Sequence, residues 1–245
     1  MAERFAGRTA IVTGAGSGIG REIALRLQAG GAWVLGADRQ PAGVPEGIEA
    51  REVDVADEQQ VAAMIAAVLS VRGSIDIMCN NAGVESTVSV TDCSVEEWDR
   101  VFAVNARGVF LGCKHVLPSM LQRGSGAIVN TASVAGMIGL RDRAAYCASK
   151  GAVVALTKQI AVQYAGTGVR CNCVCPGTVD SPWVARLLAK SDDPDAARAS
   201  LVARQPLGRL ALPGEVADAV CFLASDEAAF MTGSTLVIDG GIMAG

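Results

Sequence analysis

Three side chains in this sequence have the types and spacing of an acid–base site. Tyr146 and Lys150 lie four residues apart at the start of a predicted helix, so their side chains share one face. An ammonium group near a phenol favours the phenolate and lowers a pKa that is normally about 10. Ser133 follows a predicted strand, and we expect its hydroxyl to hold a substrate oxygen as charge develops. Together they predict a general base for an alcohol, although a Tyr–Lys pair taken alone is more often a surface feature.

A glycine-rich segment near the start of the chain predicts a phosphate site. Residues 13–20 read Thr-Gly-Ala-Gly-Ser-Gly-Ile-Gly, between a predicted strand at 9–13 and a predicted helix at 19–28. Glycines there permit a tight turn and close approach to a pyrophosphate, and the helix N-terminus supplies free N–H groups. We therefore expect a dinucleotide to contact Gly14, Ser17, Gly18, Ile19 and Gly20.

Asp38, at the end of the second predicted strand, bears on the choice of dinucleotide. A carboxylate at this place accepts both ribose hydroxyls of NAD and repels the 2′-phosphate of NADP. The adjacent Arg39 is able to accommodate a 2′-phosphate, but Ser17 occupies the glycine turn where a basic residue would favour NADP. We favour NAD. Lys150 and the positive charge of the oxidised nicotinamide are then expected to bring the pKa of Tyr146 to about 7, which requires about 4 kcal/mol.

Strand-like and helix-like segments alternate along the whole chain. This alternation predicts an α/β fold with one parallel sheet, helices on both faces and a single domain over 1–245. Pro118 is expected to kink a long helical region at 95–122. The remaining predicted strands are 32–37, 49–53, 75–79, 127–131, 169–174 and 235–238; the remaining predicted helices are 57–71, 144–164, 213–224 and 180–204, the last with a break at 191–194.

Composition excludes several classes of protein. Of the 245 residues 51% are hydrophobic and only 4% aromatic, which is typical of parallel sheets buried on both faces and excludes disorder. The longest apolar run, 61–69, is far shorter than a membrane span of about 20 residues. A net charge of −4 argues against a nucleic-acid partner. The first residues lack the apolar stretch of a secretory signal, so we expect a cytoplasmic protein.

The eight cysteines do not indicate a metal site. No two have Cys-x-x-Cys spacing, and the chain contains one histidine, so zinc is poorly supported. Cys171, Cys173 and Cys175 alternate along one apolar segment and therefore point to one face of a strand. We expect free thiols that pack in the core.

The order of these motifs resembles that of the short-chain dehydrogenase/reductase family over essentially the whole chain. The glycine turn, Asn80-Asn-Ala-Gly83, Ser133, Tyr146-x-x-x-Lys150, Pro176-Gly177 and Asp239-Gly-Gly241 follow one another as in that family. The resemblance implies a doubly wound Rossmann sheet of seven parallel strands and hydride transfer to or from a nicotinamide. It also implies a homotetramer that pairs the helices holding Asn105 and Tyr146.

The same resemblance assigns further site residues. Asn105 would be the fourth catalytic residue and would anchor a water that links the lysine to solvent. Asp54 and Val55 would meet the adenine. The other implied cofactor contacts are Asn81, Ala82, Gly83, Tyr146, Lys150, Pro176, Gly177, Thr178 and Val179.

Arginines near the expected pocket suggest an acidic substrate, because a guanidinium grips a planar carboxylate with two hydrogen bonds. Arg143 precedes Tyr146, while Arg186 and Arg204 lie in a segment at about 178–210 that forms the substrate lid in this family. Segments 175–182 and 203–205 resemble a narrower group, the cytosolic type of 3-hydroxybutyrate dehydrogenase and the 2-keto-3-deoxy-L-fuconate and rhamnonate 4-dehydrogenases. Arg143 and Arg204 match carboxylate-binding arginines of that group, and Arg186 is one residue from a third. Trp183 would either close over the substrate or pack the lid down.

These observations predict an NAD-dependent enzyme that takes a hydride from a secondary alcohol of a small hydroxy acid, a sugar-derived acid such as 2-keto-3-deoxy-L-fuconate. Two alternatives stay open. Asp38 and Ser17 argue against an NADPH-dependent 3-oxoacyl-thioester reductase. The complete set of Ser133, Tyr146 and Lys150 argues against a nucleotide-binding regulator without catalysis.

Overall fold

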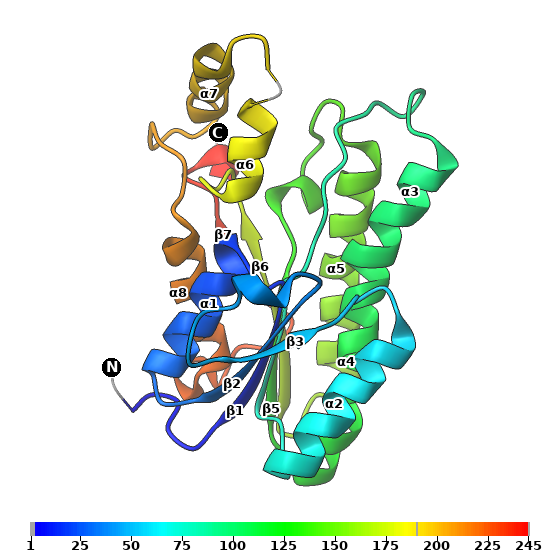
Figure 1. Ribbon diagram of the computed structural model, residues 1–245, viewed down its shortest axis with the longest axis vertical. Helices are drawn as coiled ribbons and strands as arrows, with labels where there is room; N and C mark the ends of the chain where they lie inside the picture. The colour runs from blue at the N-terminus through cyan, green and yellow to red at the C-terminus, as the bar shows by residue number, and fades with distance from the viewer. Residues whose placement is uncertain (1–2, 190, 245) are drawn as a thin grey trace.

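A computed structural model describes residues 3–189 and 191–244, and within them the chain forms a seven-stranded parallel sheet (Figure 1). The strand order is β3-β2-β1-β4-β5-β6-β7. The fold class predicted from the alternating segments is therefore confirmed. The strands are β1 (Thr9–Thr13), β2 (Trp33–Asp38), β3 (Glu49–Glu52), β4 (Ile77–Asn80), β5 (Gly126–Thr131), β6 (Val169–Pro176) and β7 (Thr235–Ile238).

Helices cover both faces of the sheet because successive strand residues point to opposite sides. Ile11 of β1 packs into one hydrophobic cluster, whereas its neighbours Ala10 and Val12 pack into the other. In Figure 1, α1 and α8 lie on one face, and α2, α4 and α5 on the other. The helices are α1 (Gly18–Ala29), α2 (Glu58–Arg72), α3 (Val95–Phe102), α4 (Gly108–Arg123), α5 (Ala144–Gln163), α6 (Pro182–Leu188), α7 (Pro194–Ala203) and α8 (Pro213–Ala224).

The strand order places a crevice at one edge of the sheet. Chain connections leave β1 toward β2 on one side and continue from β4 on the other, so a crevice opens at the carboxyl ends of these strands. The helices α6 and α7 stand at this end of the sheet (Figure 1). Between them the chain breaks as predicted, with Asp193 as the N-cap of α7. The fold thus gathers loops from distant parts of the chain around one region.

The long helical region at 95–122 differs from its prediction. A π-helical turn at Ala103–Arg107 separates α3 from α4. Pro118, where a kink was expected, lies inside α4, and the helix continues to Arg123. The turn contains Asn105, which is fully buried and hydrogen-bonded to residues outside the helix. The irregular backbone of this turn therefore coincides with the hydrogen bonds that Asn105 makes to other parts of the fold.

Six of the eight cysteines are buried as the pattern predicted, whereas Cys93 and Cys147 are only half-buried. All eight are free thiols, and Cys171, Cys173 and Cys175 lie together in one core cluster. Among the described residues, no helix is both long enough and apolar enough to cross a membrane.

Candidate active site

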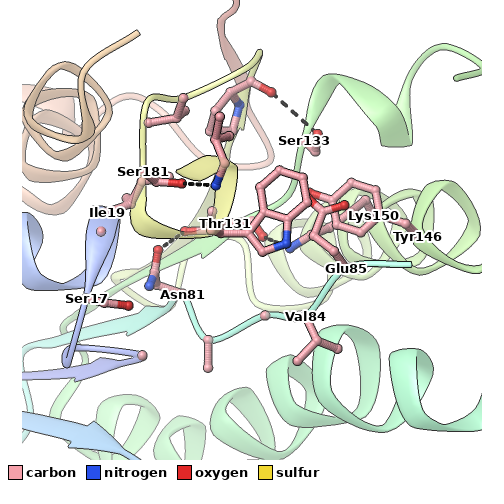
Figure 2. Close-up of a pocket in the computed structure, with 18 of the residues that line it drawn as sticks. Ser17, Ile19, Asn81, Val84, Glu85, Thr131, Ser133, Tyr146, Lys150 and Ser181 are labelled. Carbon is pink, nitrogen blue, oxygen red and sulfur yellow. Dashed lines mark hydrogen bonds between the residues drawn. The ribbon is translucent and has the colours of Figure 1, made fainter. Parts of the chain in front are cut away.

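A single cavity of about 1050 Å³ lies at the carboxyl ends of the strands (Figure 2). It is as large as the upper range of small-molecule sites, roughly 300–1,000 Å³, so it has room for a dinucleotide cofactor beside a small substrate. The structure brings most of the predicted site residues to its walls. The predicted residues that line it are Gly14, Ser17, Gly18, Ile19, Asp38, Asp54, Val55, Asn81, Ala82, Gly83, Ser133, Arg143, Tyr146, Lys150, Pro176, Gly177, Thr178, Val179, Trp183, Arg186 and Arg204.

The glycine turn forms the wall between β1 and α1. Gly14 has a φ of +69°, and a Cβ atom there would lie 2.9 Å from Ala82 Cα. A Cβ atom on Gly20 would lie 2.0 Å from the Gly14 carbonyl oxygen. Both positions therefore require glycine. Gly20, which was predicted to contact the cofactor, instead packs behind the turn and does not line the cavity.

The start of α1 fits an anionic group. Its N-cap Ser17 makes no side-chain cap hydrogen bond, and its first turn contains no acidic residue. The first N–H groups of the helix therefore have no side-chain partner, and they carry the positive end of the helix dipole. With Gly18 and Ile19 also at the cavity wall, these residues suit the pyrophosphate of a nicotinamide dinucleotide.

Asp38 is held at the rim of the same end of the cavity. Its Oδ2 accepts a hydrogen bond from Gly16 N at 2.9 Å, and its Oδ1 accepts one from Gln40 N at 2.9 Å. Two backbone donors therefore fix the carboxylate where β2 ends. Arg39 also lines the cavity but is exposed to solvent.

Asn81 ties together the strands that form the floor of the cavity. Its Nδ2 donates to Thr13 O at 3.1 Å, and Thr131 Oγ1 donates to its Oδ1 at 3.3 Å. Thr13 Oγ1 in turn accepts from the backbone N–H groups of Asn81 and Ala82 at 3.0 and 3.1 Å. These bonds join β1, the loop after β4 and β5 in one rigid unit.

Ser133, Tyr146 and Lys150 lie on one side of the cavity, away from Ser17 and Ile19 (Figure 2). Lys150 Nζ donates to Thr131 O at 2.8 Å and lies 5.8 Å from the centroid of the Tyr146 ring. Ser133 Oγ accepts from Ala135 N at 3.1 Å. Burial lowers the pKa of Lys150 to about 8. The three groups are thus adjacent, as the sequence pattern predicted.

The protein groups around Tyr146 do not by themselves lower the pKa of its phenol. Burial raises it above the usual value of a phenol, and the Glu85 carboxyl raises it further, while Ser133 and Arg143 act in the opposite direction. The predicted lowering of this pKa relied on Lys150 together with the positive charge of the oxidised nicotinamide. The protein's own groups do not provide it, because desolvation of the phenolate outweighs nearby positive charge.

Asn105 acts on the backbone beside the cavity and does not line it. Its Oδ1 accepts from Val84 N at 2.7 Å, and its Nδ2 donates to Val84 O at 2.8 Å and to Ser149 Oγ at 3.1 Å. The side chain therefore fixes the loop after β4 against α5. The predicted water link to Lys150 stays a prediction.

The three predicted arginines line the cavity but differ in their contacts and exposure. Arg143 Nη1 donates to Ser86 O at 3.2 Å, and its Cζ lies 5.8 Å from the centroid of the Trp183 ring. Trp183 belongs to α6, so this contact joins α6 to the start of α5. Arg186 and Arg204 are exposed side chains at the cavity wall and form no ion pair with any residue of 3–189 or 191–244.

Sequence reasoning missed Glu85, which also lines the cavity. Its side chain is 19% exposed, and its Oε2 is buried without a hydrogen-bond partner in the described part of the chain. Burial raises its pKa to about 7, against the opposing charges of Arg143 and Lys150. The signal was its place directly after the Asn80–Val84 segment, at the carboxyl end of a strand beside the crevice.

Comparisons with known proteins agree with this site. The family model described as enoyl-(acyl carrier protein) reductase matches residues 14–243. The 2-(R)-hydroxypropyl-CoM dehydrogenase of Xanthobacter autotrophicus is 44% identical, over 95% of this chain and 97% of that protein. The 2-keto-3-deoxy-L-fuconate dehydrogenase of Xanthomonas campestris is 42% identical, over 97% of this chain and 81% of that protein.

A solved structure extends the likeness to three dimensions. Ligand-free aldohexose dehydrogenase of Thermoplasma acidophilum has a TM-score of 0.94 and 37% sequence identity, and the match covers 100% of this chain and 97% of that one. The chain belongs to the short-chain dehydrogenase/reductase family, whose dehydrogenases act on CH–OH groups with NAD(P).

Proposed function

We propose that this protein uses NAD to oxidise a secondary alcohol of a small hydroxy acid, and that the acid is sugar-derived, such as 2-keto-3-deoxy-L-fuconate. The 42% identity to a dehydrogenase of that compound supports the substrate class. The 44% identity to a hydroxypropyl-CoM dehydrogenase supports oxidation of a secondary alcohol. A cytoplasmic location and a homotetramer stay predictions.

The observation that carries the proposal is the pair of unpaired arginines on the α6–α7 segment. Arg186 and Arg204 line the cavity without an ion-pair partner in the described residues, whereas Arg198 of the same segment is paired with Asp180 at 2.5 Å. A planar guanidinium suits a carboxylate, which it binds through two parallel hydrogen bonds. An acid whose alcohol lies at Tyr146 would therefore find its carboxylate partners on this segment.

The choice of NAD rests on Asp38. Its two oxygens are held by backbone donors at the end of β2, so the negative charge is unable to swing away from a 2′-phosphate. A 2′-phosphate would face that charge, whereas ribose hydroxyls would donate hydrogen bonds to it. Arg39 is exposed and would weaken this preference without reversing it.

The chain's own residues would manage the proton and the orientation of the alcohol. Ser133 would hold the alcohol oxygen while Tyr146 accepts its proton, with Lys150 fixed beside the ring by Thr131. When bound, NAD supplies the hydride acceptor and a positive charge that favours the phenolate. Because burial raises the pKa of Tyr146, this base would need that charge or alkaline conditions.

Initial rates with NAD and with NADP, for hydroxy acids and their uncharged amides, test the proposal. We expect turnover of 2-keto-3-deoxy-L-fuconate or a related acid with NAD, and a much smaller kcat/KM for the amide. Arg204→Ala should raise KM for the acid, while the control Arg141→Ala, which removes an exposed arginine outside the cavity, should not. Equal efficiency with acid and amide would refute the acid assignment.

A further inference from the structure

Glu85 lines the cavity with a side chain that is 19% exposed, and one of its two carboxyl oxygens is buried. Its buried Oε2 has no hydrogen-bond partner among the described residues. The nearest cation, Arg143 Nη1, lies 3.8 Å from this oxygen, beyond hydrogen-bonding distance. Leaving a buried carboxyl oxygen unpaired is costly. A carboxyl group held at this cost, with part of its side chain open to the cavity, suits a role in which its accessible oxygen meets a ligand.

The loop that carries Glu85 is fixed on both sides. Asn105 binds both backbone groups of Val84, at 2.7 and 2.8 Å, immediately before Glu85. Arg100 Nη2 donates to the Glu85 carbonyl oxygen at 2.8 Å, and Arg143 Nη1 donates to the carbonyl oxygen of Ser86 at 3.2 Å. The acceptor is therefore held in place before any ligand arrives, which is how precise recognition sites are built.

The surroundings of Glu85 decide which ligand group it would meet. Glu85 lies near enough to Tyr146 and Lys150 for its charge to affect both, and Figure 2 shows the three side chains on the same side of the cavity. A carboxylate accepts hydrogen bonds and repels another carboxylate, so the acid end of a substrate would lie elsewhere. Arg186 and Arg204 offer that place on the α6–α7 segment.

We propose that Glu85 is a specificity-determining residue that accepts a hydrogen bond from a second hydroxyl of the substrate, next to the hydroxyl that reacts at Tyr146. This inference rests on the proposed function and narrows it from hydroxy acids to acids with neighbouring hydroxyls. A substrate without the second hydroxyl leaves the carboxyl group at the cavity wall without that hydrogen bond, and sites built around such a bond reject the incomplete analogue strongly.

Matched substrate pairs that differ by one hydroxyl test the inference. One pair is 2-keto-3-deoxy-L-fuconate and 4-hydroxy-2-oxohexanoate of the same configuration at the reacting carbon. A second pair is 3,4-dihydroxybutanoate and 3-hydroxybutanoate, and a neutral pair is 2,3-butanediol and 2-butanol. The measured quantity is the ratio of kcat/KM for the diol to that for the mono-alcohol.

At a pH above about 8, where the Glu85 carboxyl with its pKa of about 7 is ionised, we expect a ratio of about 10 to 100 for the unmodified enzyme, the value of one hydrogen bond to a charged group. Glu85→Met keeps the length of the side chain and removes the acceptor, so the ratio should fall to about 1. Glu85→Gln keeps one weaker acceptor oxygen and should give an intermediate ratio. Because each ratio comes from one protein sample, a partly misfolded variant lowers both rates and leaves the ratio unchanged.

The outcomes separate this inference from the proposed function. A ratio near 1 in the unmodified enzyme, or a ratio that Glu85→Met leaves unchanged, overturns the role of Glu85 even if acids remain the preferred substrates. A high ratio that depends on Glu85, together with a kcat/KM for the neutral diol as large as that for the acids, supports the role of Glu85 and overturns the acid assignment. Turnover of none of the pairs overturns both.

Discussion

The two ends of the cavity are built from different material. At the cofactor end, the walls are largely backbone: the glycine turn, the uncapped start of α1 and the strand ends, with Asp38 held by two backbone N–H groups. At the end where we propose that the substrate binds, called the substrate end below, the walls include charged side chains from loops and short helices. There Arg186 and Arg204 are unpaired in the described structure, and Glu85 keeps a free acceptor oxygen.

This difference separates walls that depend on the backbone from walls that depend on individual side chains. A backbone cradle depends on a few glycines and on strand order, so it tolerates little change. Side chains on a loop or on α6 are replaceable without altering the sheet. We therefore expect recognition of the dinucleotide to depend on the fold, and we propose that recognition of the alcohol depends on these side chains.

Tyr146 is the proposed proton acceptor, and its removal should give the largest effect. Tyr146→Phe removes the proton acceptor and leaves the ring, so kcat should fall by about 10² to 10⁴. Cofactor affinity, measured by the fluorescence of bound NADH, should hardly change. In the unmodified enzyme the oxidation rate should rise with pH, because burial raises the pKa of the phenol that must lose its proton. A variant with near-native turnover would remove Tyr146 from the mechanism.

Changes confined to the substrate end should alter KM without altering the cofactor site. Arg204→Ala or Arg186→Ala should raise KM for an acid substrate by about 10- to 100-fold, the value of a hydrogen bond to a charged group. Lysine at the same position should restore only part of the affinity for the acid, since an ammonium group lacks the planar shape with which a guanidinium binds a carboxylate. Steady-state kinetics with acid and NAD varied in turn check this. A parallel rise in KM for NAD would show that the two ends are not separable.

A change confined to the cofactor end should alter the cofactor preference without altering KM for the acid. The unmodified enzyme should prefer NAD over NADP by at least about tenfold in kcat/KM, equivalent to about 1.4 kcal/mol. Asp38→Ala should relax this preference and leave KM for the acid nearly unchanged. Asp54→Asn, which alters another acid at the same end, is the control and should keep the preference for NAD. Equal efficiency of the unmodified enzyme with both cofactors would contradict the role of Asp38.

The contrast between backbone and side-chain walls also explains which features the sequence predicted and which it did not. The order of strands and helices and the glycine turn follow from local patterns, because periodicity and backbone freedom are written in neighbouring residues. The π-helical turn at Ala103–Arg107 has no such local signal: its Asn105 is bonded to Val84 and Ser149, which are distant in sequence. Glu85 belongs to no motif, and only the fold shows that its carboxyl is buried beside Tyr146.

The smallest expected effect is that of the raised pKa of Glu85 on the stability of the protein. This effect is measurable without any ligand. The folded-state pKa is about 7, above the 4.5 of an ordinary glutamate, because burial outweighs the charges of Arg143 and Lys150. The contribution of Glu85 to stability is therefore complete below pH 4.5 and is lost as the pH rises toward 7. Between pH 5.5 and 6.5 the loss should be about 1 kcal/mol of unfolding free energy.

Urea denaturation of the unmodified protein and of Glu85→Gln at both pH values isolates this contribution, since all other groups cancel in the difference. Glu215→Gln is the control: its carboxyl is bonded to Arg209, which holds its pKa at about 2, so it is ionised in both states over this range. The change in unfolding free energy between the two pH values should be the same in Glu215→Gln as in the unmodified protein. In Glu85→Gln the loss of about 1 kcal/mol on raising the pH should disappear. If Glu85→Gln left the pH dependence of the unfolding free energy unchanged, the Glu85 carboxyl would be solvated like a surface carboxyl group. The substrate end would then lack the buried acceptor that distinguishes it from the cofactor end.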